Sequence, residues 1–255
     1  MKLRLFAILA TSLVAAAYSH ADDYSFRESF KKSCAFSATG SVTLENVNGD
    51  VEIRTWDKNE ILIEGEKSAK TEEELKAVDL TIDLSDSRAA IKVRLPKRSG
   101  SWFSGNTIRA SVRFTLTVPA TAALDRIATV NSSVSVEGVR GDAHVETVNG
   151  SIHAVGLGGS ARLKTVNGQI EATFTSVAAG QEFSLETVNG TITVELPKDA
   201  GIALRTSVVN GHVDCEFPLT LTKSSGRHNL SGTIGDGRAS LKAETVNGSI
   251  RIEER

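Results

Sequence analysis

Aromatic residues, proline, cysteine and methionine are all scarce in this chain of 255 residues. Phe, Trp and Tyr together make up 5% of it, and there are four prolines, two cysteines and one methionine. A core built on aromatic packing is therefore not expected. Many Val, Ile and Thr residues and 21 glycines favour a narrow β core filled by small side chains.

The chain also lacks an excess of positive charge and, after its first 21 residues, a long apolar run. Its 29 Lys and Arg residues are balanced by 31 Asp and Glu residues, which gives a formal net charge of −2. We expect no nucleic-acid partner, because such a partner requires a basic surface. We also expect no integral membrane segment after residue 21, because no later segment is apolar over the length of a bilayer.

Residues 1–21 have the form of a secretory signal peptide. Lys2 and Arg4 are followed by a largely apolar run from Leu5 to Tyr18, and Ser19-His20-Ala21 fits a cleavage site of small residues. No cysteine follows directly, so a lipid anchor at this point is not expected. The pattern predicts export to the periplasm, with secretion or display on the cell surface as the alternative.

The phrase Glu-Thr-Val-Asn-Gly occurs three times, and related phrases recur along most of the chain. A period near 20 residues is typical of a solenoid or blade array, in which each unit packs on its neighbours. The longest late interval, from Asn210 to Asn247, resembles two periods with a decayed copy at "HNLSGTIG". The asparagines of the copies are Asn48, Asn131, Asn149, Asn167, Asn189, Asn210 and Asn247.

Apolar and polar residues alternate strictly on both sides of each Asn-Gly pair. Leu163 and Thr165 precede one pair on the inward face, and Ile170 and Ala172 follow it on the same face. Such alternation predicts strands with one buried face. Two all-β folds fit: a parallel β-helix with about 18–22 residues per coil, and an antiparallel meander with Asn-Gly hairpins. The near-identity of the corners favours the β-helix, because its coils stack equal residues on one another.

One domain is predicted for residues 22–255, since no proline-rich or low-complexity linker divides them. Residues 129–255 should form the regular Asn-Gly coils. Residues 56–128 contain longer, less regular strand patterns and should form wider opening coils or an N-terminal cap. Within them, "RSGSWFSGN" predicts a loop that exposes Trp102 and Phe103 to a protein partner or a glycan.

The Asn-Gly corners themselves are interpreted as a structural ladder rather than a binding site. Asn side chains on stacked coils can form amide-to-amide hydrogen bonds, and Asn and Gly suit tight bends. The glycines of this ladder are Gly49, Gly150, Gly168, Gly190, Gly211 and Gly248.

No catalytic or metal-binding residue is predicted. The outward rows before the corner mix charge signs, as solvated strand faces do; they contain His144, Arg162, Ser184, Arg205 and Lys242 in one row, and Glu146, Lys164, Glu186, Ser207 and Glu244 in the other. After the corner, His153, His212 and Asp214 are the best polar candidates. His153 and His212 should lie three coils apart, too far to share a metal ion.

The two cysteines are not expected to form a disulfide, although exported proteins meet oxidising conditions. Cys215 aligns with inward residues of other coils and should be buried as a small apolar residue. Cys34 precedes the first coil and should lie several coils away.

With its Asn-Gly repeats, the run "VRFTLTVPA" and glycine-rich rear corners, the chain from about Ser41 to Ile252 resembles a bacterial family of exported proteins labelled "putative adhesin", a domain of unknown function. The resemblance implies a β-helical fold and a cell-envelope setting, without catalytic residues or cofactors. The predicted function is a non-enzymatic binding or scaffolding surface for an envelope protein or glycan. The alternatives are a carbohydrate-active β-helix enzyme and an envelope-stress sensor. Charges in the final "RIEER" favour a capped monomer.

Overall fold

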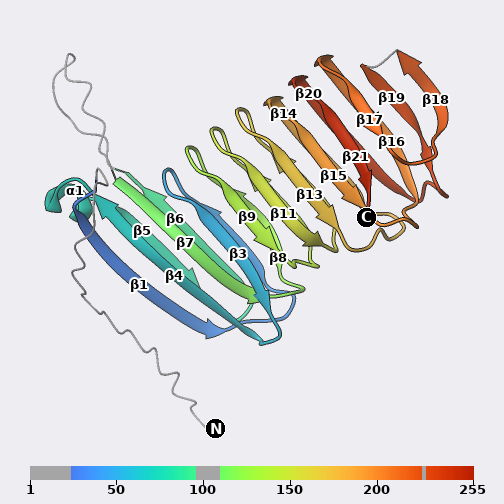
Figure 1. Cartoon of the computed structure of the whole chain (residues 1–255). Helices are drawn as coiled ribbons and strands as arrows, with labels where there is room; N and C mark the ends of the chain where they lie inside the picture. The colour runs from blue at the N-terminus through green and yellow to red at the C-terminus, as the bar shows by residue number, and fades with distance from the viewer. Residues whose placement is uncertain (1–23, 96–109, 226–227) are drawn as a thin grey trace, which may run out of the picture.

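Two β-sheets lie face to face in the computed structural model, which describes residues 24–95, 110–225 and 228–255 (Figure 1). The ten-stranded sheet has the order β1 (Phe26–Ala35), β4 (Glu60–Ala69), β7 (Ala110–Pro119), β3 (Val51–Trp56), β9 (Val134–Glu137), β11 (Ile152–Leu157), β13 (Ile170–Phe174), β15 (Ile192–Leu196), β21 (Ile250–Glu254), β17 (Val213–Cys215).

The eleven-stranded sheet has the order β18 (Thr220–Ser225), β19 (Asn229–Ile234), β16 (Ile202–Asn210), β20 (Ala239–Asn247), β14 (Glu182–Asn189), β12 (Ala161–Lys164), β10 (Ala143–Glu146), β8 (Ala123–Ala128), β2 (Ser41–Glu45), β6 (Arg88–Arg94), β5 (Asp79–Leu84). One short helix, α1 (Glu72–Lys76), lies at the N-terminal end of the stack (Figure 1). The Thr71 side chain caps it by accepting a hydrogen bond from the Glu74 backbone N–H at 3.2 Å.

The predicted parallel β-solenoid is confirmed. The two strands that flank an Asn-Gly corner, such as β10 and β11, belong to different sheets, and each pairs in parallel with the equivalent strand of the next coil. In a meander of hairpins those two strands would instead pair with each other. The parallel register places like residues on like residues, with Ile152 on Ile170 and Ile170 on Ile192.

The alternation in the sequence produces the core between the sheets. In β12 and β13 every second side chain is buried, including Leu163, Ile170 and Ala172. The core is narrow and largely aliphatic, and its few aromatic contacts include Phe174 on Phe183, whose ring centroids are 4.4 Å apart. The threonines of the repeat also point inward and are buried; they are Thr129, Thr147, Thr165, Thr187 and Thr245.

The order of the coils in space differs from their order in the sequence. The coil of β20 and β21 lies between the coil of β14 and β15 and the coil of β16 and β17. The interpretation of "HNLSGTIG" as a decayed coil is therefore wrong. That segment contains the whole of β19, which pairs antiparallel with β16 and β18 at this end of the eleven-stranded sheet.

A similar excursion occurs at the N-terminal end. After the first coil, β2 and β3, the chain leaves the stack and forms β4 and β5, both antiparallel to their neighbours, before β6 and β7 add a parallel coil outside β2 and β3. It then returns at β8, on the other side of β2. Residues 56–128 thus supply an outer coil together with antiparallel strands.

The expectations for the two cysteines, the signal peptide, the Trp102–Phe103 loop and membrane-spanning segments can be compared with the described residues. Cys34 and Cys215 are free thiols on β1 and β17, the two opposite edges of the ten-stranded sheet, and burial raises the pKa of both. Cys215 is only partly buried. The predicted signal peptide, residues 1–21, and the Trp102–Phe103 loop lie outside the described residues. Within the described ranges, no helix has the length and apolar character needed to cross a membrane.

Candidate functional site

The asparagines of the repeat form one continuous ladder of side-chain hydrogen bonds. From Asn131 onward, each Nδ2 donates to the Oδ1 of the preceding asparagine in the ladder at 2.7–3.0 Å. At the N-terminal end, the Asn48 Nδ2 donates to the backbone oxygen of Ala110 at 2.9 Å. These bonds use one donor and one acceptor of each amide within the ladder. In space the ladder runs Asn48, Asn131, Asn149, Asn167, Asn189, Asn247, Asn210.

Threonine and glycine complete the corner. The Thr165 Oγ1 donates to the backbone oxygen of Gly150 at 2.9 Å, and equivalent bonds join Thr187 to Gly168 and Thr245 to Gly190. The central glycines are required by close backbone approach. A Cβ on Gly168 would lie 2.0 Å from the Gly150 oxygen, although Gly168 is not among the glycines with positive φ. The same residues therefore recur at each corner because the contacts between coils require them.

The valine of each Thr-Val-Asn-Gly phrase lies beside the asparagine ladder and was not singled out by the sequence analysis. These side chains form a row of partly exposed valines along the corner; Val130, Val148, Val188 and Val246 are 39–40% exposed. The signal was present in the sequence, because Val precedes the Asn of the bend in every copy and follows an inward Thr in five of the seven.

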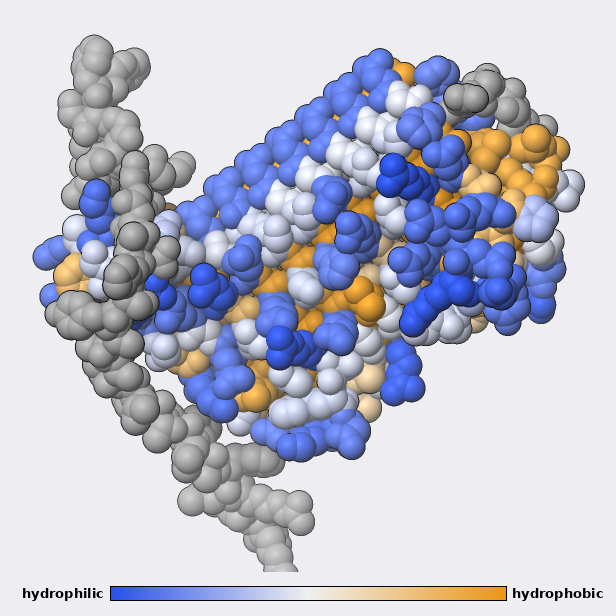
Figure 2. Space-filling model, viewed as in Figure 1, coloured by the Kyte–Doolittle hydropathy of each residue, from blue (hydrophilic) through white to orange (hydrophobic). Residues whose placement is uncertain are grey.

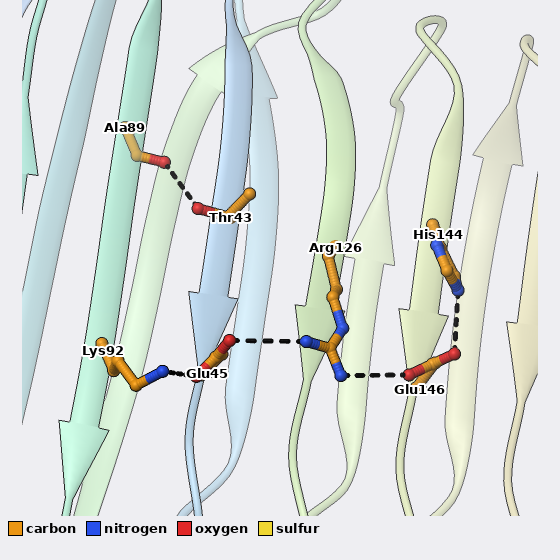
Figure 3. A network of polar contacts seen from close by, with 7 residues as sticks. All are labelled: Thr43, Glu45, Ala89, Lys92, Arg126, His144 and Glu146. Carbon is orange, nitrogen blue, oxygen red and sulfur yellow. Dashed lines mark hydrogen bonds and ion pairs between the residues drawn. The ribbon is translucent and has the colours of Figure 1, made fainter.

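The outward side chains of the eleven-stranded sheet form ion pairs across coils. Glu45 on β2 contacts both Lys92 on β6 and Arg126 on β8, and the Lys92 hydrogen bond lowers the pKa of Glu45 (Figure 3). The Arg126 Nη2 lies 3.7 Å from the Glu146 Oε2, and the Glu146 Oε1 lies 3.0 Å from the His144 Nε2. This network joins four adjacent strands where the chain returns from its first excursion.

A second network lies further along the same sheet. Glu186 on β14 is 3.4 Å from the Lys164 Nζ on β12 and 3.6 Å from the Lys242 Nζ on β20. Lys242 also contacts Glu244 at 2.8 Å. Partial burial acts to raise the pKa of Glu186, but the two lysines outweigh it and the pKa is lowered overall.

We expect Glu186→Gln to remove part of the acid sensitivity of the fold. The pKa of Glu186 is lower in the folded chain, so its contribution is present above the unfolded pKa and is lost as pH falls through the folded pKa. The effect should be less than about 1 kcal/mol at neutral pH, because the pair is partly exposed. Urea unfolding of both proteins at about pH 7 and about pH 3 measures it. An equal loss of stability in both on acidification would contradict this assignment.

A groove of about 960 Å³ crosses the outer face of the eleven-stranded sheet over β8, β10, β12, β14 and β20. Its middle row contains His144, Arg162, Ser184 and Lys242 in register. The guanidinium of Arg162 is exposed and has no ion-pair or hydrogen-bond partner among the described residues, in contrast to His144 and Lys242. The row before it contains Asp142, Ser160, Glu182 and Ser240.

A smaller hollow of about 330 Å³ lies on the ten-stranded sheet, where β7, β3, β9 and β11 meet. Ser133, Ser135 and Ser151 leave space between Glu52 and His153. The outward side chains on this face are mainly hydrophilic, with apolar groups visible between the rows (Figure 2). The Asp50 Oδ1 accepts a hydrogen bond from the Ser133 backbone N–H at 3.2 Å. This polar group of the hollow is therefore already used in a contact between neighbouring coils.

The predicted polar candidates after the corner remain separate. The His153 Nδ1 is 2.8 Å from the Glu171 Oε2, and the His212 Nε2 is 3.0 Å from the Asp214 Oδ2. The two histidines lie four coils apart rather than the predicted three, because the β20–β21 coil is inserted between them. The described ranges contain no group of three or more His, Cys, Asp or Glu residues placed to hold a metal ion.

The coil order also brings Ser249 to His212, an arrangement that the sequence analysis missed. The Ser249 Oγ is 3.0 Å from the His212 Nδ1, so serine, histidine and Asp214 form a chain of hydrogen-bonding groups. The side chains of His212 and Asp214 are 47% and 62% exposed. Water therefore screens the carboxylate from the imidazole. In serine hydrolases the serine contacts Nε2 of the histidine and the aspartate contacts Nδ1, whereas here Ser249 contacts Nδ1 and Asp214 contacts Nε2. The chain of contacts does not by itself indicate a hydrolase.

The structure is similar to several solved bacterial proteins. One is a "putative cell adhesion protein" from Clostridium sporogenes, with a TM-score of 0.50 and 13% identity over 90% of this chain and 100% of that one. Another is a "putative adhesin" from Bacteroides fragilis, with a TM-score of 0.41 and 10% identity over 88% of this chain and 97% of that one. At such identities the first similarity supports the fold alone, and the second carries no further argument.

A third similar structure is a "putative lipid binding protein" from Parabacteroides distasonis, with a TM-score of 0.29 and 11% identity over 88% of this chain and 96% of that one. Among curated proteins, none matches the sequence. The model of the family described as Toastrack DUF4097 matches residues 125–253, just over half of the chain, and the protein therefore belongs to that family.

Proposed function

We propose that this protein is an exported, non-enzymatic binding protein of the bacterial cell envelope, which engages its ligand along the outer face of the eleven-stranded sheet. The observation that carries the proposal is Arg162, an exposed guanidinium in a groove of about 960 Å³ that has no partner within the described part of the chain. The lysines of the groove, Lys164 and Lys242, are both paired with Glu186 across the coils, whereas Arg162 has no such partner among the residues described and is free to bind an external molecule.

The rest of the fold supports a rigid platform rather than a reaction centre. The corner amides bond to one another, the corner threonine hydroxyls donate to glycine backbone oxygens, and the charged side chains around the groove are spread in rows along the sheet. A solenoid presents such rows at a constant spacing of about 4.8 Å. The name of the similar structure from Clostridium sporogenes, "putative cell adhesion protein", agrees with a binding role. Export rests on the form of residues 1–21.

The test has two parts. Cell fractionation should find the full chain in the periplasm or at the surface, and a chain without residues 1–21 in the cytoplasm. Purified protein should bind isolated envelopes saturably, and Arg162→Ala should weaken that binding by about tenfold, the usual effect of losing a hydrogen bond to a charged group. Cytoplasmic retention of the full chain, or the absence of saturable envelope binding, would refute the proposal.

A further inference from the structure

The groove on the eleven-stranded sheet has the length of an extended ligand. It crosses five adjacent strands, which corresponds to about 19 Å measured across the sheet at the usual strand separation. The strands run parallel and in register, so equivalent outward positions recur at each step. A ligand with a repeating chemical unit would meet one outward side chain of each row at every step along its length. Several sugar residues of a linear chain fit this dimension.

The unpaired groups of the groove combine donors with acceptors. Arg162 only donates, and the carboxylates of Asp125, Asp142 and Glu182 only accept when ionised. Asp125 and Glu182 have no ion-pair partner among the described residues, and Asp142 uses one oxygen to accept from the Ser160 backbone N–H at 3.0 Å. The hydroxyls of Ser160 and Ser240 lie in the same row as these carboxylates and can do both. A ligand must therefore offer donors and acceptors side by side.

The same groups argue against a strongly charged ligand. Arg162 is two residues from Ser160 along β12, so the rows of Arg162 and of Asp142 and Glu182 are about 7 Å apart. That separation is within the screening length of about 8 Å at physiological ionic strength. A polyanion would be repelled by Asp125, Asp142 and Glu182, and the cationic groups of a polycation, which only donate, would leave Arg162 without an acceptor. Hydroxyl groups satisfy both rows without repulsion.

We infer that the groove binds a linear, uncharged polysaccharide, whose hydroxyls accept hydrogen bonds from Arg162 and donate to Asp142 and Glu182. This inference rests on the proposed function and specifies its ligand. The aromatic residue that lines the groove, Phe183, is buried, so no ring is available to stack on a sugar. Each sugar is then held by hydrogen bonds alone, and binding relies on repetition along the polymer.

Affinity gel electrophoresis of the full chain in gels that contain a soluble polysaccharide tests the inference. The neutral probes are a β-1,3-glucan, an α-1,4-glucan and a β-1,4-mannan; the charged probes are polygalacturonate and polylysine. We expect retardation by at least one neutral polymer. Arg162→Ala and Glu182→Ala should each lower its association constant by about tenfold. The matched control is Arg251→Ala, an exposed arginine without a described partner on the outer face of the ten-stranded sheet, which should bind like the wild type.

Three results would overturn the inference. One is retardation by a charged probe and by no neutral one, which would contradict the charge argument. Another is neutral-polymer binding that both groove variants retain, particularly if replacement of Trp102 and Phe103 abolishes it, which would move the contact to that loop. The third is binding to none of the neutral probes. If envelopes still bind saturably in that case, the proposed function stands without this ligand; if they do not, both fail. Unchanged unfolding temperatures of the variants exclude loss of folding as the cause.

Discussion

A chain that ends at Arg238 is expected to lose its cooperative fold rather than one coil of it. The missing strands, β20 and β21, lie inside the stack, where β20 pairs with β14 and β16, and β21 pairs with β15 and β17. Their removal separates the coil of β16 and β17 from its support. It also removes Leu241, Ile250 and Ile252, all buried, whose burial contributes roughly 5–9 kcal/mol. That is comparable with the whole stability of a domain, about 5–15 kcal/mol.

The matched control is deletion of residues 150–167, which removes one period and joins Asn149 directly to Gly168. The register of the repeat is then kept, and β9 can pair with β13 as β11 does now. This protein should be less stable but should still unfold in one transition, as expected for a stack of similar units. Circular dichroism during heating and limited proteolysis compare the two deletions. A chain ending at Arg238 that unfolds cooperatively near the wild-type temperature would show that β16 can pair with β14 instead.

Gly190→Ala is expected to lower the free energy of unfolding by about 3–5 kcal/mol, in the upper range for a single substitution. The added Cβ would lie 1.9 Å from the backbone oxygen of Gly168 and 2.6 Å from its carbon. Backbone atoms cannot rotate away as a side chain can, so the coils must separate locally. That separation weakens the Thr187 hydrogen bond to the same Gly168 oxygen and the neighbouring asparagine ladder.

Gly180→Ala is the control for the conformational contribution of glycine. Gly180 has a φ of +81°, which favours glycine, but no atom lies within 4 Å of the Cβ position. Its substitution should cost about 1–2 kcal/mol from backbone strain alone. Chemical denaturation of both variants gives the comparison. If Gly180→Ala were the more damaging of the two, close approach between coils would not be the reason for glycine at the corner.

The sequence predicts the coil but not the order of the coils. Alternation around Leu163 and Ile170 is sufficient to define two strands and a corner, because burial of one face requires it. The phrases around Asn189 and Asn247 are nearly identical, so each can stack on the other or on any third copy with the same contacts. Only the spacing of the copies along the chain could indicate the order of the coils. It gave the wrong order because the antiparallel strands β18 and β19 lie between Asn210 and Asn247.

Only part of the candidate groove could be predicted from the sequence. Alternation identifies Arg162 and Glu186 as outward residues, and mixed signs indicate a solvated face. Which charges neutralise one another depends on distances across coils, and Lys242 reaches Glu186 only because the coil order makes β14 and β20 neighbours. Arg162 lies between His144 and Ser184, its in-register neighbours on β10 and β14. Its lack of a partner among the described residues depends on side-chain distances that residue types alone do not give.

The inserted coil also has a consequence for the time at which the chain can fold. Residues 202–234 are synthesised before residues 239–254, yet they reach their final position only when the later residues lie between them and β14 and β15. Growth of the stack from one end, one coil at a time during synthesis, is therefore impossible for this region. An emerging chain can assemble the coils up to β15 and must then hold the next segment unplaced. Closure of the stack is a late event that depends on contacts distant in sequence, which are slow to form.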